Sequence, residues 1–514
     1  MCSSDLVMDA RLRSDKAGVE ADGRFVAPHN PPLRLIVVGA VHIAQPLLAM
    51  ARLAGYDPML IDPRETFGAA ERFPGEVILD DWPDEALATL APDSRSAIVT
   101  LTHDPKLDDM ALMEALKSPA FYVGALGSRV NTAKRKGYTV VPGYGQDGIE
   151  RSVELLGQVP VVSAVMGTTA GGPSMRAILA HWSIMVKGTG QIFAAGPPVV
   201  ERAFGEKLHK DELGGTKVAV DTAGTIDNVA ENEQDCFEQI RRFLSYMPQN
   251  VWELPPVENI GDPVDRCEDA LASIVPRSNR QAYNMKKLVG LIVDRDSLFE
   301  IQPTFGKAVI TALARMNGKV VGIIASNPMV GGIMDVKAAR KQGHFAELCD
   351  MFNIPIILFA DIPGLMVGRE SEADAILREG VRTRYILGQV KVPMFTVIVR
   401  KCYGVAGGGF IDRAGLNFKI AWPSGEWGSL PVEGGVKAAY RREIESAPDP
   451  AAREREIEAE LKQLASPFRT AEAFAIEDLI DPRETRPYLC QFIDAMQGRL
   501  ASQLGPKYRA GVRP

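Results

Sequence analysis

The sequence lacks the patterns that mark secreted, membrane-bound and zinc-binding proteins. Its six cysteines form no C-x-x-C pair and its six histidines form no H-E-x-x-H motif, so we expect reduced thiols and no metal site. No apolar run approaches the roughly 20 residues that cross a bilayer, and the N-terminus has no apolar signal core. These absences predict a cytoplasmic protein with no membrane partner.

An excess of positive charge is absent as well. The chain carries 58 Lys and Arg against 65 Asp and Glu, a formal net charge of −7. Nucleic acid is therefore not expected as a partner, because neutralising phosphates needs a basic surface. What the chain has is an ordinary globular composition, 46% hydrophobic and 24% charged, over 514 residues. Because one core seldom holds that many residues, we expect two to four domains.

Residues 33–135 alternate between short apolar runs and helix-like stretches. Strands are expected at 35–40, 59–61, 97–101 and 121–126, and helices at 43–53 and 107–116. Runs rich in Val and Ile are typical of strands buried on both faces, and strands that alternate with helices form parallel, doubly wound sheets. We therefore predict a Rossmann-like α/β unit.

The first strand-to-helix turn of this segment carries part of a dinucleotide-binding pattern. Gly39 opens the turn and Asp62 ends the second strand about twenty residues later, a spacing that suits ribose recognition. The full G-x-G-x-x-G is absent, because Val41 and Ala44 stand where glycines would. Gly39, His42 and Asp62 are the candidate nucleotide-binding residues, and the alternative is that a His beside a turn is structural.

Two later segments repeat one phrase: Val-Pro, an apolar strand, a Gly-rich turn and a helix. The first copy runs from Val159 to Trp182 with its turn at 167–173, and the second begins at Val392 with its turn at 403–409. A turn of small residues that opens a helix gathers unpaired backbone N–H groups at one point, where the helix dipole adds partial positive charge. Such a point suits a phosphate or a developing oxyanion.

These turns allow a structural and a functional interpretation. Gly171-Gly172 and Gly407-Gly408-Gly409 could simply allow tight packing of helix on strand. Duplication favours the functional interpretation, because packing alone does not require the whole phrase twice. Two oxyanion holes suggest two reacting carbonyl groups and hence a group transfer, and no G-x-S-x-G elbow or Walker A motif accompanies them.

Short phrases in a fixed order run through residues 137–514. They are TTAGG at 168–172, MVKGTGQIF at 185–193, GPPVV at 196–200, ELGG at 212–215, DIPG at 361–364, VRKCYG at 399–404, AWPS at 421–424 and IDPRETR at 480–486. With them the segment resembles the carboxyltransferase (β) subunits of biotin-dependent acyl-CoA carboxylases, of the propionyl-CoA and acetyl-CoA carboxylase type. The resemblance implies two crotonase-like (ββα) halves and, in the family, a ring of six subunits.

The resemblance also implies a reaction and its residues. In the family, carboxybiotin releases CO2 and leaves a ureido oxyanion. The biotin nitrogen then takes the α-proton of an acyl-CoA thioester, and the resulting enolate attacks the CO2. Gly171 and Gly172 would hold the enolate, and Val405 and Ala406 the biotin oxygen. The family often has Gly in place of Val405, but a main-chain N–H survives that change. The substrate-binding residues implied in the same way are Thr169, Ala170, Gly196, Pro197, Gly404 and Gly407.

The implied partners are acyl-CoA, a biotin carboxylase or biotin carboxyl carrier subunit that presents carboxybiotin, and further copies of the chain. One departure from the family lies in front of Tyr138. Family members carry a further long segment there, with strands of the first half and part of the CoA site, and this chain has something unrelated in its place. We therefore expect an incomplete first half and weak or absent acyl-CoA carboxylation.

Residues 33–135 have a series of phrases of their own. They are VGAVHIA at 38–44, LIDPR at 60–64, ERFP at 71–74, LTHDPKLD at 101–108 and YVGALGSR at 122–129. The segment resembles the C-terminal Rossmann domain of the XdhC family, maturation factors for molybdenum hydroxylases such as xanthine dehydrogenase, cut short before the family's final strands. A nucleotide is the ligand that this resemblance and the turn suggest.

The remaining polar residues near the turns are expected to be structural. We interpret Cys402 as a packed thiol, Asp361 as a turn cap, and Lys187 and Arg400–Lys401 as exposed cations. Two helices are expected near the C-terminus, an exposed charged one at 454–464 and an amphipathic closing one at 486–504.

The predicted organisation has five parts. They are a disordered tail at 1–32, whose start at Cys2–Leu6 resembles a sequencing scar; the truncated XdhC-like segment at 33–135; the truncated N-terminal carboxyltransferase half at 137–250; a Pro-rich linker at 251–276; and the C-terminal half at 277–514. Three hypotheses stay open: an acyl-CoA carboxyltransferase, an XdhC-like maturation or binding factor in which only the Rossmann segment acts, and a non-functional chimera.

Overall fold

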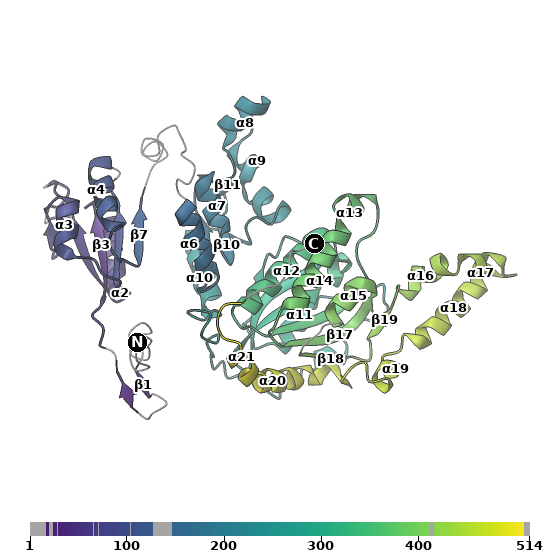
Figure 1. Cartoon of the computed structure of the whole chain (residues 1–514). Helices are drawn as coiled ribbons and strands as arrows, with labels where there is room; N and C mark the ends of the chain where they lie inside the picture. Colours follow the sequence, from purple (N-terminus) through teal and green to yellow (C-terminus); the bar gives the residue numbers. More distant parts are fainter. Residues whose placement is uncertain are drawn as a thin grey trace. The chain divides into compact units, whose positions relative to one another are not determined.

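The chain divides into two compact units in the computed structural model, residues 1–144 and 145–514 (Figure 1). The structure describes residues 17–19, 24–27, 29–64, 66–69, 71–102, 104–126, 146–411 and 416–507. Each unit has hydrophobic clusters of its own. Among these residues, no helix is long and apolar enough to cross a membrane.

The first unit is built on a five-stranded parallel sheet in the order β5-β4-β3-β6-β7. Its elements are β3 (Leu33–Val38), α2 (Ala44–Leu53), β4 (Tyr56–Ile61), β5 (Ile78–Leu79), α3 (Pro83–Leu90), β6 (Ser96–Thr100), α4 (Pro105–Ala115) and β7 (Tyr122–Ala125). Along β3, Leu35 and Val37 pack into one cluster and Ile36 and Val38 into another, so both faces of the strand are buried. The strand order reverses between β3 and β6, as in doubly wound Rossmann-like sheets.

The predicted elements of this unit are all present, and β5 and α3 are additional. β5 has two residues and α3 has eight, too few for a hydrophobic period to be distinct. Inside the predicted disordered tail, β1 (Gly18–Val19) and β2 (Phe25–Val26) pair antiparallel. The end of the unit that the sequence places near residue 135 lies outside the described residues.

The second unit begins with a short half-fold. Its sheet has the parallel order β12-β10-β8, and β9 pairs in parallel with β11. The elements are α6 (Gln146–Leu156), β8 (Val162–Val165), β9 (Thr168–Ala170), α7 (Gly172–Ile178), β10 (Trp182–Val186), β11 (Gln191–Phe193), α8 (Pro197–Phe204), α9 (Lys210–Gly214), a π-helix η1 (Lys217–Thr222), β12 (Asn228–Ala230) and α10 (Glu233–Ser245). The helical run predicted to reach Trp182 ends at Ile178, because Trp182 starts a strand and is fully buried.

The second half of this unit has an eight-stranded sheet in the order β13-β14-β15-β16-β17-β18-β20, with β19 beside β17. Pairing is antiparallel from β13 to β15 and parallel from β15 onward. The strands are β13 (Phe299–Ile301), β14 (Val309–Met316), β15 (Lys319–Ser326), β16 (Ile356–Ile362), β17 (Met394–Tyr403), β18 (Asn417–Ala421), β19 (Glu426–Gly428) and β20 (Asp478–Leu479).

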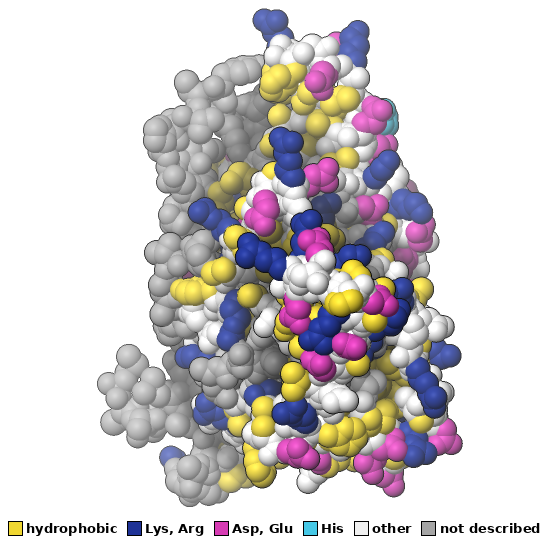
Figure 2. Space-filling view, turned by 90° about the vertical axis from the view of Figure 1, so that its right-hand side faces the viewer, with side chains coloured by type: hydrophobic (Ala, Val, Ile, Leu, Met, Phe, Trp, Pro, Cys, Tyr) yellow, Lys and Arg dark blue, Asp and Glu magenta, His cyan; other side chains and the backbone are white. Residues whose placement is uncertain are grey.

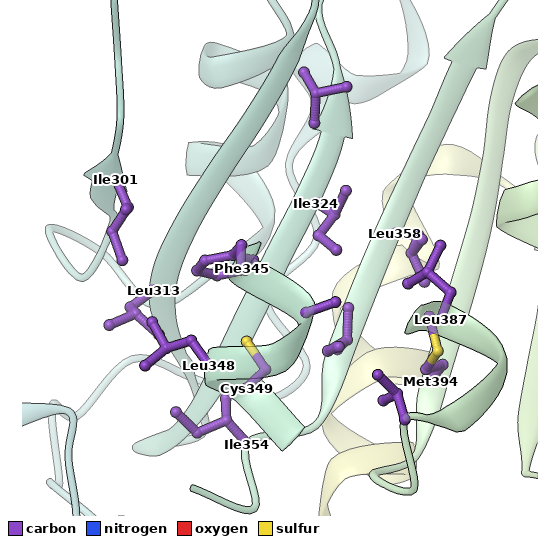
Figure 3. Packing of buried hydrophobic residues seen from close by; sticks show 14 of the residues in the cluster. Ile301, Leu313, Ile324, Phe345, Leu348, Cys349, Ile354, Leu358, Leu387 and Met394 are labelled. Carbon is purple, nitrogen blue, oxygen red and sulfur yellow. The ribbon is translucent and has the colours of Figure 1, made fainter. Parts of the chain in front are cut away.

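Helices cover both faces of this sheet. α12 (Val336–Met351) and α14 (Ile376–Gln389) pack on one face, and α11 (Met285–Ile292) and α20 (Thr485–Ala495) on the other. α16 (Val432–Ala439), α17 (Arg441–Ser446) and α18 (Pro450–Leu464) pack against one another instead. The remaining elements are α13 (Arg369–Ala373), α15 (Gly404–Ile411), α19 (Pro467–Glu472), α21 (Gln497–Ala501) and the 3-10 turns η2 (Asp269–Ala272), η3 (Pro328–Val330) and η4 (Pro482–Glu484). Figure 3 shows Phe345, Leu348 and Cys349 of α12 packed towards Ile324 of β15 and Leu358 of β16. These side chains form the main core of the unit.

The two halves share one pattern of strand pairing. β17 pairs with β18 and, at its carboxyl end, with β19, while β18 pairs with β20. β8 and β9 pair in the same way with β10 and β11, and β10 pairs with β12. β17 also pairs with β16 on its other edge, whereas no described residue pairs with the corresponding edge of β8. Among the described residues the first half therefore has no counterpart of β13–β16 or α12.

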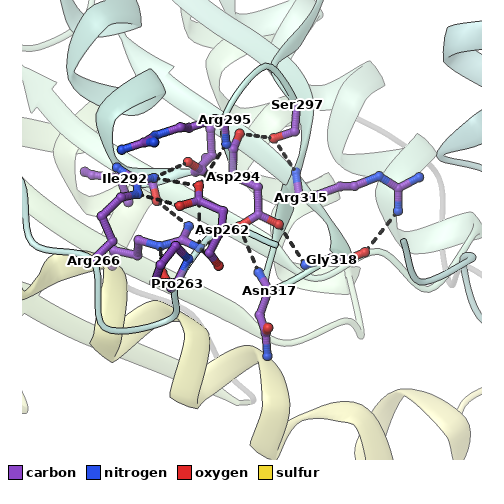
Figure 4. Close-up of polar contacts among 12 residues, drawn as sticks. Asp262, Pro263, Arg266, Ile292, Asp294, Arg295, Ser297, Arg315, Asn317 and Gly318 are labelled. Atoms are coloured by element: carbon purple, nitrogen blue, oxygen red, sulfur yellow. Dashed lines mark hydrogen bonds and ion pairs between the residues drawn. The ribbon is translucent and has the colours of Figure 1, made fainter. Parts of the chain in front are cut away.

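The Pro-rich stretch between the halves is fixed by buried ion pairs rather than free. Asp262 and Arg266 lie 2.7 Å apart, and Arg486 at the start of α20 contacts Asp294 at 2.8 Å (Figure 4). The Arg486 and Asp294 side chains are each 1% exposed. Arg486 also donates to the carbonyl of Pro263 at 2.8 Å and to that of Ile292 at 3.0 Å, so α20 is fastened to the predicted linker and to the end of the helix at 285–292.

The C-terminal region differs from its prediction at one place. The expected closing helix at 486–504 consists of two helices, α20 and α21, and its first residue is a buried anchor. α18 is largely exposed, as expected, with Ile457 as its buried residue. Figure 2 shows basic and acidic side chains intermingled on the face that carries α17 and α18, where Arg453 pairs with Glu443 at 2.7 Å.

The ring of His181 joins the end of α6 to the segment just before β8 in the first half. Its Nδ1 accepts from the backbone N–H of Val161 at 3.0 Å, its Nε2 donates to the carbonyl of Leu156 at 2.9 Å, and its ring packs edge-on against Phe352. Burial lowers the pKa of His181 from 6.5 to about 4. On acidification the unfolded chain therefore binds a proton first, and stability present above pH 6.5 is lost as the pH falls towards 4.

We predict that the protonation of His181 alone lowers the free energy of unfolding of the second unit by about 2 kcal/mol when the pH falls from 7 to 5. Denaturant unfolding followed by tryptophan fluorescence measures it, with His181→Gln as the comparison. The variant should be less stable at pH 7 and should lose less stability on acidification. Parallel pH dependence in the two proteins would contradict the assignment.

Candidate active site

The first Gly-rich turn lies where β9 ends and α7 begins. Gly171 has a φ of +66°, a conformation that side-chain-bearing residues rarely adopt, and its N–H donates to the carbonyl of Phe193 at 3.3 Å. Gly172 is the first residue of α7, so its N–H has no acceptor within the helix, and Pro173 has no N–H at all. The Gly172 N–H can therefore donate to a ligand, whereas the Gly171 N–H already donates to the carbonyl of Phe193.

The other predicted residues of the first half gather around this turn. Thr169 and Ala170 lie on β9 and pair with Ile192 and Phe193 of β11. Gly196 caps α8 and Pro197 is its first residue. Because β9 and β11 are parallel, their carboxyl ends and the two helix starts lie at the same edge. Sequence reasoning missed Ser174, whose hydroxyl donates to the Phe193 carbonyl at 3.1 Å.

The second turn is mostly the first turn of a helix. β17 runs to Tyr403 and α15 begins at Gly404, so the segment predicted as a Gly-rich turn at 403–409 is strand end and helix start. Val405 and Ala406 lie in the first turn of α15, where backbone N–H groups have no acceptor within the helix. The Val405 side chain is 74% exposed, whereas Ala406 is buried.

Gly407 allows α15 to approach β17. A Cβ at this position would lie 2.6 Å from the carbonyl carbon of Cys402, closer than van der Waals contact permits. A Cβ at the neighbouring Gly408 would meet nothing within 4 Å. Cys402 is itself buried, as expected for a packed thiol. The position of the helix start, and so of its N–H groups, depends on the glycine at 407.

The two turns have the same backbone arrangement. Gly404 has a φ of +61°, close to that of Gly171, and each glycine faces the carbonyl that follows the paired short strand. That carbonyl belongs to Ala194 in the first half and to Ser429 in the second, 3.8 and 3.3 Å from a Cβ placed on the glycine. The strand registers therefore align Gly172 with Val405.

A buried ion pair fixes the end of β17 in front of the second turn. Nη2 of Arg400 lies 3.0 Å from Oδ2 of Asp361 at the end of β16, and the N–H of Lys401 donates to Oδ1 at 3.1 Å. Arg400 also donates to the carbonyl of Gln281 at 3.0 Å and lies over the ring of Tyr283. Arg400 and Asp361 are both buried, which corrects their interpretation as an exposed cation and a turn cap.

Lys187 is exposed, as expected, and its ammonium pairs with Glu231 at 3.0 Å.

The two turns open onto different cavities. One of about 410 Å³ lies beside Thr169, Pro173 and Arg176 of the first half. Val405 and Ala406 border a smaller apolar cavity of about 110 Å³ against α14. In Figure 1, α7 and α15 lie on either side of α12 and α14.

The structure brings the predicted nucleotide residues of the first unit together at the carboxyl ends of the neighbouring strands β3 and β4. Gly39 follows β3, and its N–H donates to the carbonyl of Ile61 at 2.8 Å, while His42 is exposed in the turn before α2. Asp62 follows β4 and is 2% exposed; it accepts from the Ala40 N–H at 2.8 Å and from two nitrogens of Arg64 at 2.7 and 2.8 Å. Against the opposing effect of burial, these bonds lower the pKa of Asp62. The Asp62 carboxylate, which the spacing assigned to a ribose, therefore already accepts hydrogen bonds from Ala40 and Arg64.

The two halves with their helix-opening turns define the second unit as a crotonase-like α/β fold, and the first unit as a Rossmann-like fold. The chain belongs to the carboxyl transferase domain family, which it matches over residues 100–509. Residues 35–153 match the XdhC Rossmann domain. The two matches share residues 100–153, and the structure places the described residues up to β7 in the Rossmann-like sheet.

Relatives of the chain include subunits of a CoA-ester carboxylase and of a CoA-ester decarboxylase. The propionyl-CoA carboxylase carboxyltransferase subunit of Haloferax mediterranei is 34% identical over 73% of both chains. Methylmalonyl-CoA decarboxylase subunit alpha of Veillonella parvula is 32% identical over 75% of this chain and 74% of its own. The transcarboxylase 12S structure, a hexamer with methylmalonyl-coenzyme A and methylmalonic acid bound, superposes with a TM-score of 0.67 at 28% identity, covering 84% of this chain and 77% of that one.

The two adjacent glycines of α15 predict opposite effects of the same substitution. Gly407→Ala should lower the free energy of unfolding of the second unit by about 1–3 kcal/mol, because the new methyl group overlaps the backbone at Cys402. Gly408→Ala should leave it unchanged or raise it by up to about 1 kcal/mol, because its Cβ meets open space and alanine favours a helix. Guanidinium unfolding of the two variants checks this, and equal midpoints would contradict the close approach.

Proposed function

We propose that the second unit is a carboxyltransferase that works between carboxybiotin on a carrier protein and the α-carbon of an acyl-CoA. The observation that carries the proposal is the duplicated turn, one in each half, in a member of the carboxyl transferase domain family. Carboxybiotin would supply the CO2. The N–H groups of Val405 and Ala406 would hold negative charge on the ureido oxygen, and those of Gly172 and Gly171 the charge on the thioester oxygen.

Backbone donors suit this task because they are held rigidly before charge develops. A single preorganised donor contributes roughly 3 kcal/mol to a transition state with oxyanion character. Thr169, Ala170, Gly196 and Pro197 would surround the acyl-CoA, and Gly404 and Gly407 would set the position of the biotin turn.

The separation of the two turns supports an oligomer. Within one chain they open onto different cavities, so a neighbouring copy would have to bring its first turn to the second turn of this chain. The hexamer of the transcarboxylase 12S structure is a precedent for such an assembly. The remaining partner in the proposal is a biotin carboxylase or biotin carboxyl carrier subunit, which delivers the carboxybiotin.

The two sites are not equally complete. The second turn is backed by β16, α12 and α14, whereas no described strand pairs with the outer edge of β8 next to the first turn. We therefore expect the biotin side to work and the acyl-CoA side to be weak. Residues that line the acyl-CoA pocket of a complete first half would belong to the absent strands.

The biotin side is tested by release of CO2 from free carboxybiotin with the full chain. Val405→Pro removes one N–H at a helix position where proline is tolerated, and it should slow the release by about 10²–10³-fold. Val405→Ala keeps the N–H and shortens the side chain, so it should slow release by no more than about threefold. Equal rates for the two variants would contradict the assignment of Val405.

The acyl-CoA side is tested with propionyl-CoA and carboxybiotin. Carboxylation should be absent or at least about a hundredfold slower than the roughly 10 s⁻¹ of a typical enzyme. An ordinary rate from the purified chain would show that the first half is complete enough to act.

A second candidate function concerns the first unit, because its sheet order and its match to the XdhC Rossmann domain are independent of carboxyl transfer. A nucleotide would lie at the carboxyl ends of β3 and β4, beside Gly39 and His42, with Asp62 retaining its bonds to Arg64. An XdhC-like role in the maturation of a molybdenum hydroxylase would use the same edge. Protection of this unit from heat unfolding by NADH supports nucleotide binding, and no protection at millimolar NADH removes it.

A further inference from the structure

A second polar cavity lies between the two halves, away from both turns. It has a volume of about 440 Å³, and its walls come from the first half on one side and from α12 and the segment after β13 on the other. Ile178, Ala180 and Phe305 contribute apolar surface, while Asp227, Lys341 and His344 contribute charge. Arg340 of α12 also borders the cavity, but its guanidinium is already paired with Glu379 at 3.2 Å. Neither turn of the candidate active site borders it, so this cavity needs its own explanation.

The basic side of the cavity belongs to α12. Lys341 is 1% exposed, and its ammonium donates to the carbonyls of Gln302 at 2.7 Å and Phe305 at 3.1 Å, which leaves a third N–H. His344 is one turn further along the same helix, with 45% of its side chain exposed. Two positively charged or chargeable donors therefore face the cavity from neighbouring positions of one helix.

The acidic side is a single buried carboxyl group. Oδ2 of Asp227 accepts from the N–H and the hydroxyl of Ser183 at 2.7 and 2.8 Å. Oδ1 lies 3.9 Å from Nε2 of His344, too far for a hydrogen bond, so an oxygen atom placed between them can contact both. Burial raises the pKa of Asp227 against the opposing effects of His344 and Ser183, which favours its protonated, donating form.

Gln302 adds an independent sign that the cavity has a ligand. It has a φ of +54°, which is unfavourable for a residue with a side chain, and it is 4% exposed. Its Oε1 has no hydrogen-bond partner among the described residues. Strained backbone and unsatisfied buried polar atoms both concentrate at functional sites.

We propose that this cavity binds a short-chain aliphatic carboxylate, with the carboxylate between Lys341 and His344 and the alkyl chain against Ile178 and Phe305. A carboxylate has one charge and two acceptor oxygens, which match the two donors on α12. The apolar part of the wall, Ile178, Ala180 and Phe305, favours an alkyl tail over a phosphate, whose oxygens would all need donors. The site is independent of the proposed carboxyl transfer, because it uses none of the residues of either turn.

The test is direct binding of butyrate to the full-length protein by saturation-transfer NMR. Butyramide has the same chain without the charge. Inorganic phosphate has charge without the chain and no carbon-bound protons to observe, so its binding is measured by its displacement of butyrate. We expect butyrate to bind with a millimolar dissociation constant, and both comparison compounds to bind at least about tenfold more weakly. Equal binding of butyramide, or no butyrate signal at about 50 mM, would overturn the proposal.

Variants then locate the site. His344→Gln should weaken butyrate binding by about tenfold, because it removes a charge-assisted hydrogen bond at a half-exposed position. His29→Gln, the same substitution at an exposed histidine of the first unit, should leave binding unchanged. Lys341→Met should abolish binding; if that variant does not fold, His344→Gln decides alone. Undiminished binding in His344→Gln would place the ligand elsewhere and refute the proposal, whatever the carboxyltransferase assays give.

Discussion

The buried pair of Arg400 and Asp361 holds together the part of the structure on which the second turn depends. The pair joins the carboxyl ends of β16 and β17. Arg400 also donates to the carbonyl of Gln281 and so holds the segment that follows the Pro-rich linker at 251–276. Breaking a buried pair by removing one partner typically costs about 3–5 kcal/mol, because the remaining charge stays buried without compensation. Since α15 starts only a few residues after Arg400, the direction of its free N–H groups is set by this pair.

The internal repeat shows how the same backbone can be supported in two ways. In both halves a glycine with positive φ ends a strand, faces a carbonyl of the neighbouring short strand and opens a helix. The second copy stands in the middle of a broad sheet. The first copy has a helix, α6, and the ring of His181 next to its outer strand. The first turn therefore forms with only the strands that follow it in the chain, β10 and β11, as described strand neighbours of β8 and β9.

Much of this architecture could be read from the sequence, because apolar strand runs and small-residue turns are local signals. The runs at 35–40 and 392–399 and the phrase around Gly171 were found in this way. The buried roles of Arg400, Asp361 and Arg486 could not be, since a charged residue in a sequence is expected at the surface unless its partner is known. Their partners lie 39 residues away for the first pair and 192 for Arg486 and Asp294.

The same limit applies to the sites. The spacing from Gly39 to Asp62 correctly identified a strand end, but not that Arg64 and Ala40 already occupy the carboxylate. The cavity around Lys341 and Asp227 has no motif at all, because its residues come from the end of α7, from β10, from the loop before β12, from the segment after β13 and from α12, which meet only in the folded chain. Ser174 had a weak signal, a hydroxyl residue in the first turn of a helix.

No described strand pairs with the outer edge of β8, and this edge affects whether copies of the chain associate. An exposed strand edge is a template on which other strands can add, and long flat edges are the usual starting points of aggregation. β8 has only four residues, so an incoming strand would gain few main-chain hydrogen bonds there. An edge this short is a poor template for fibrils even though no described strand covers it.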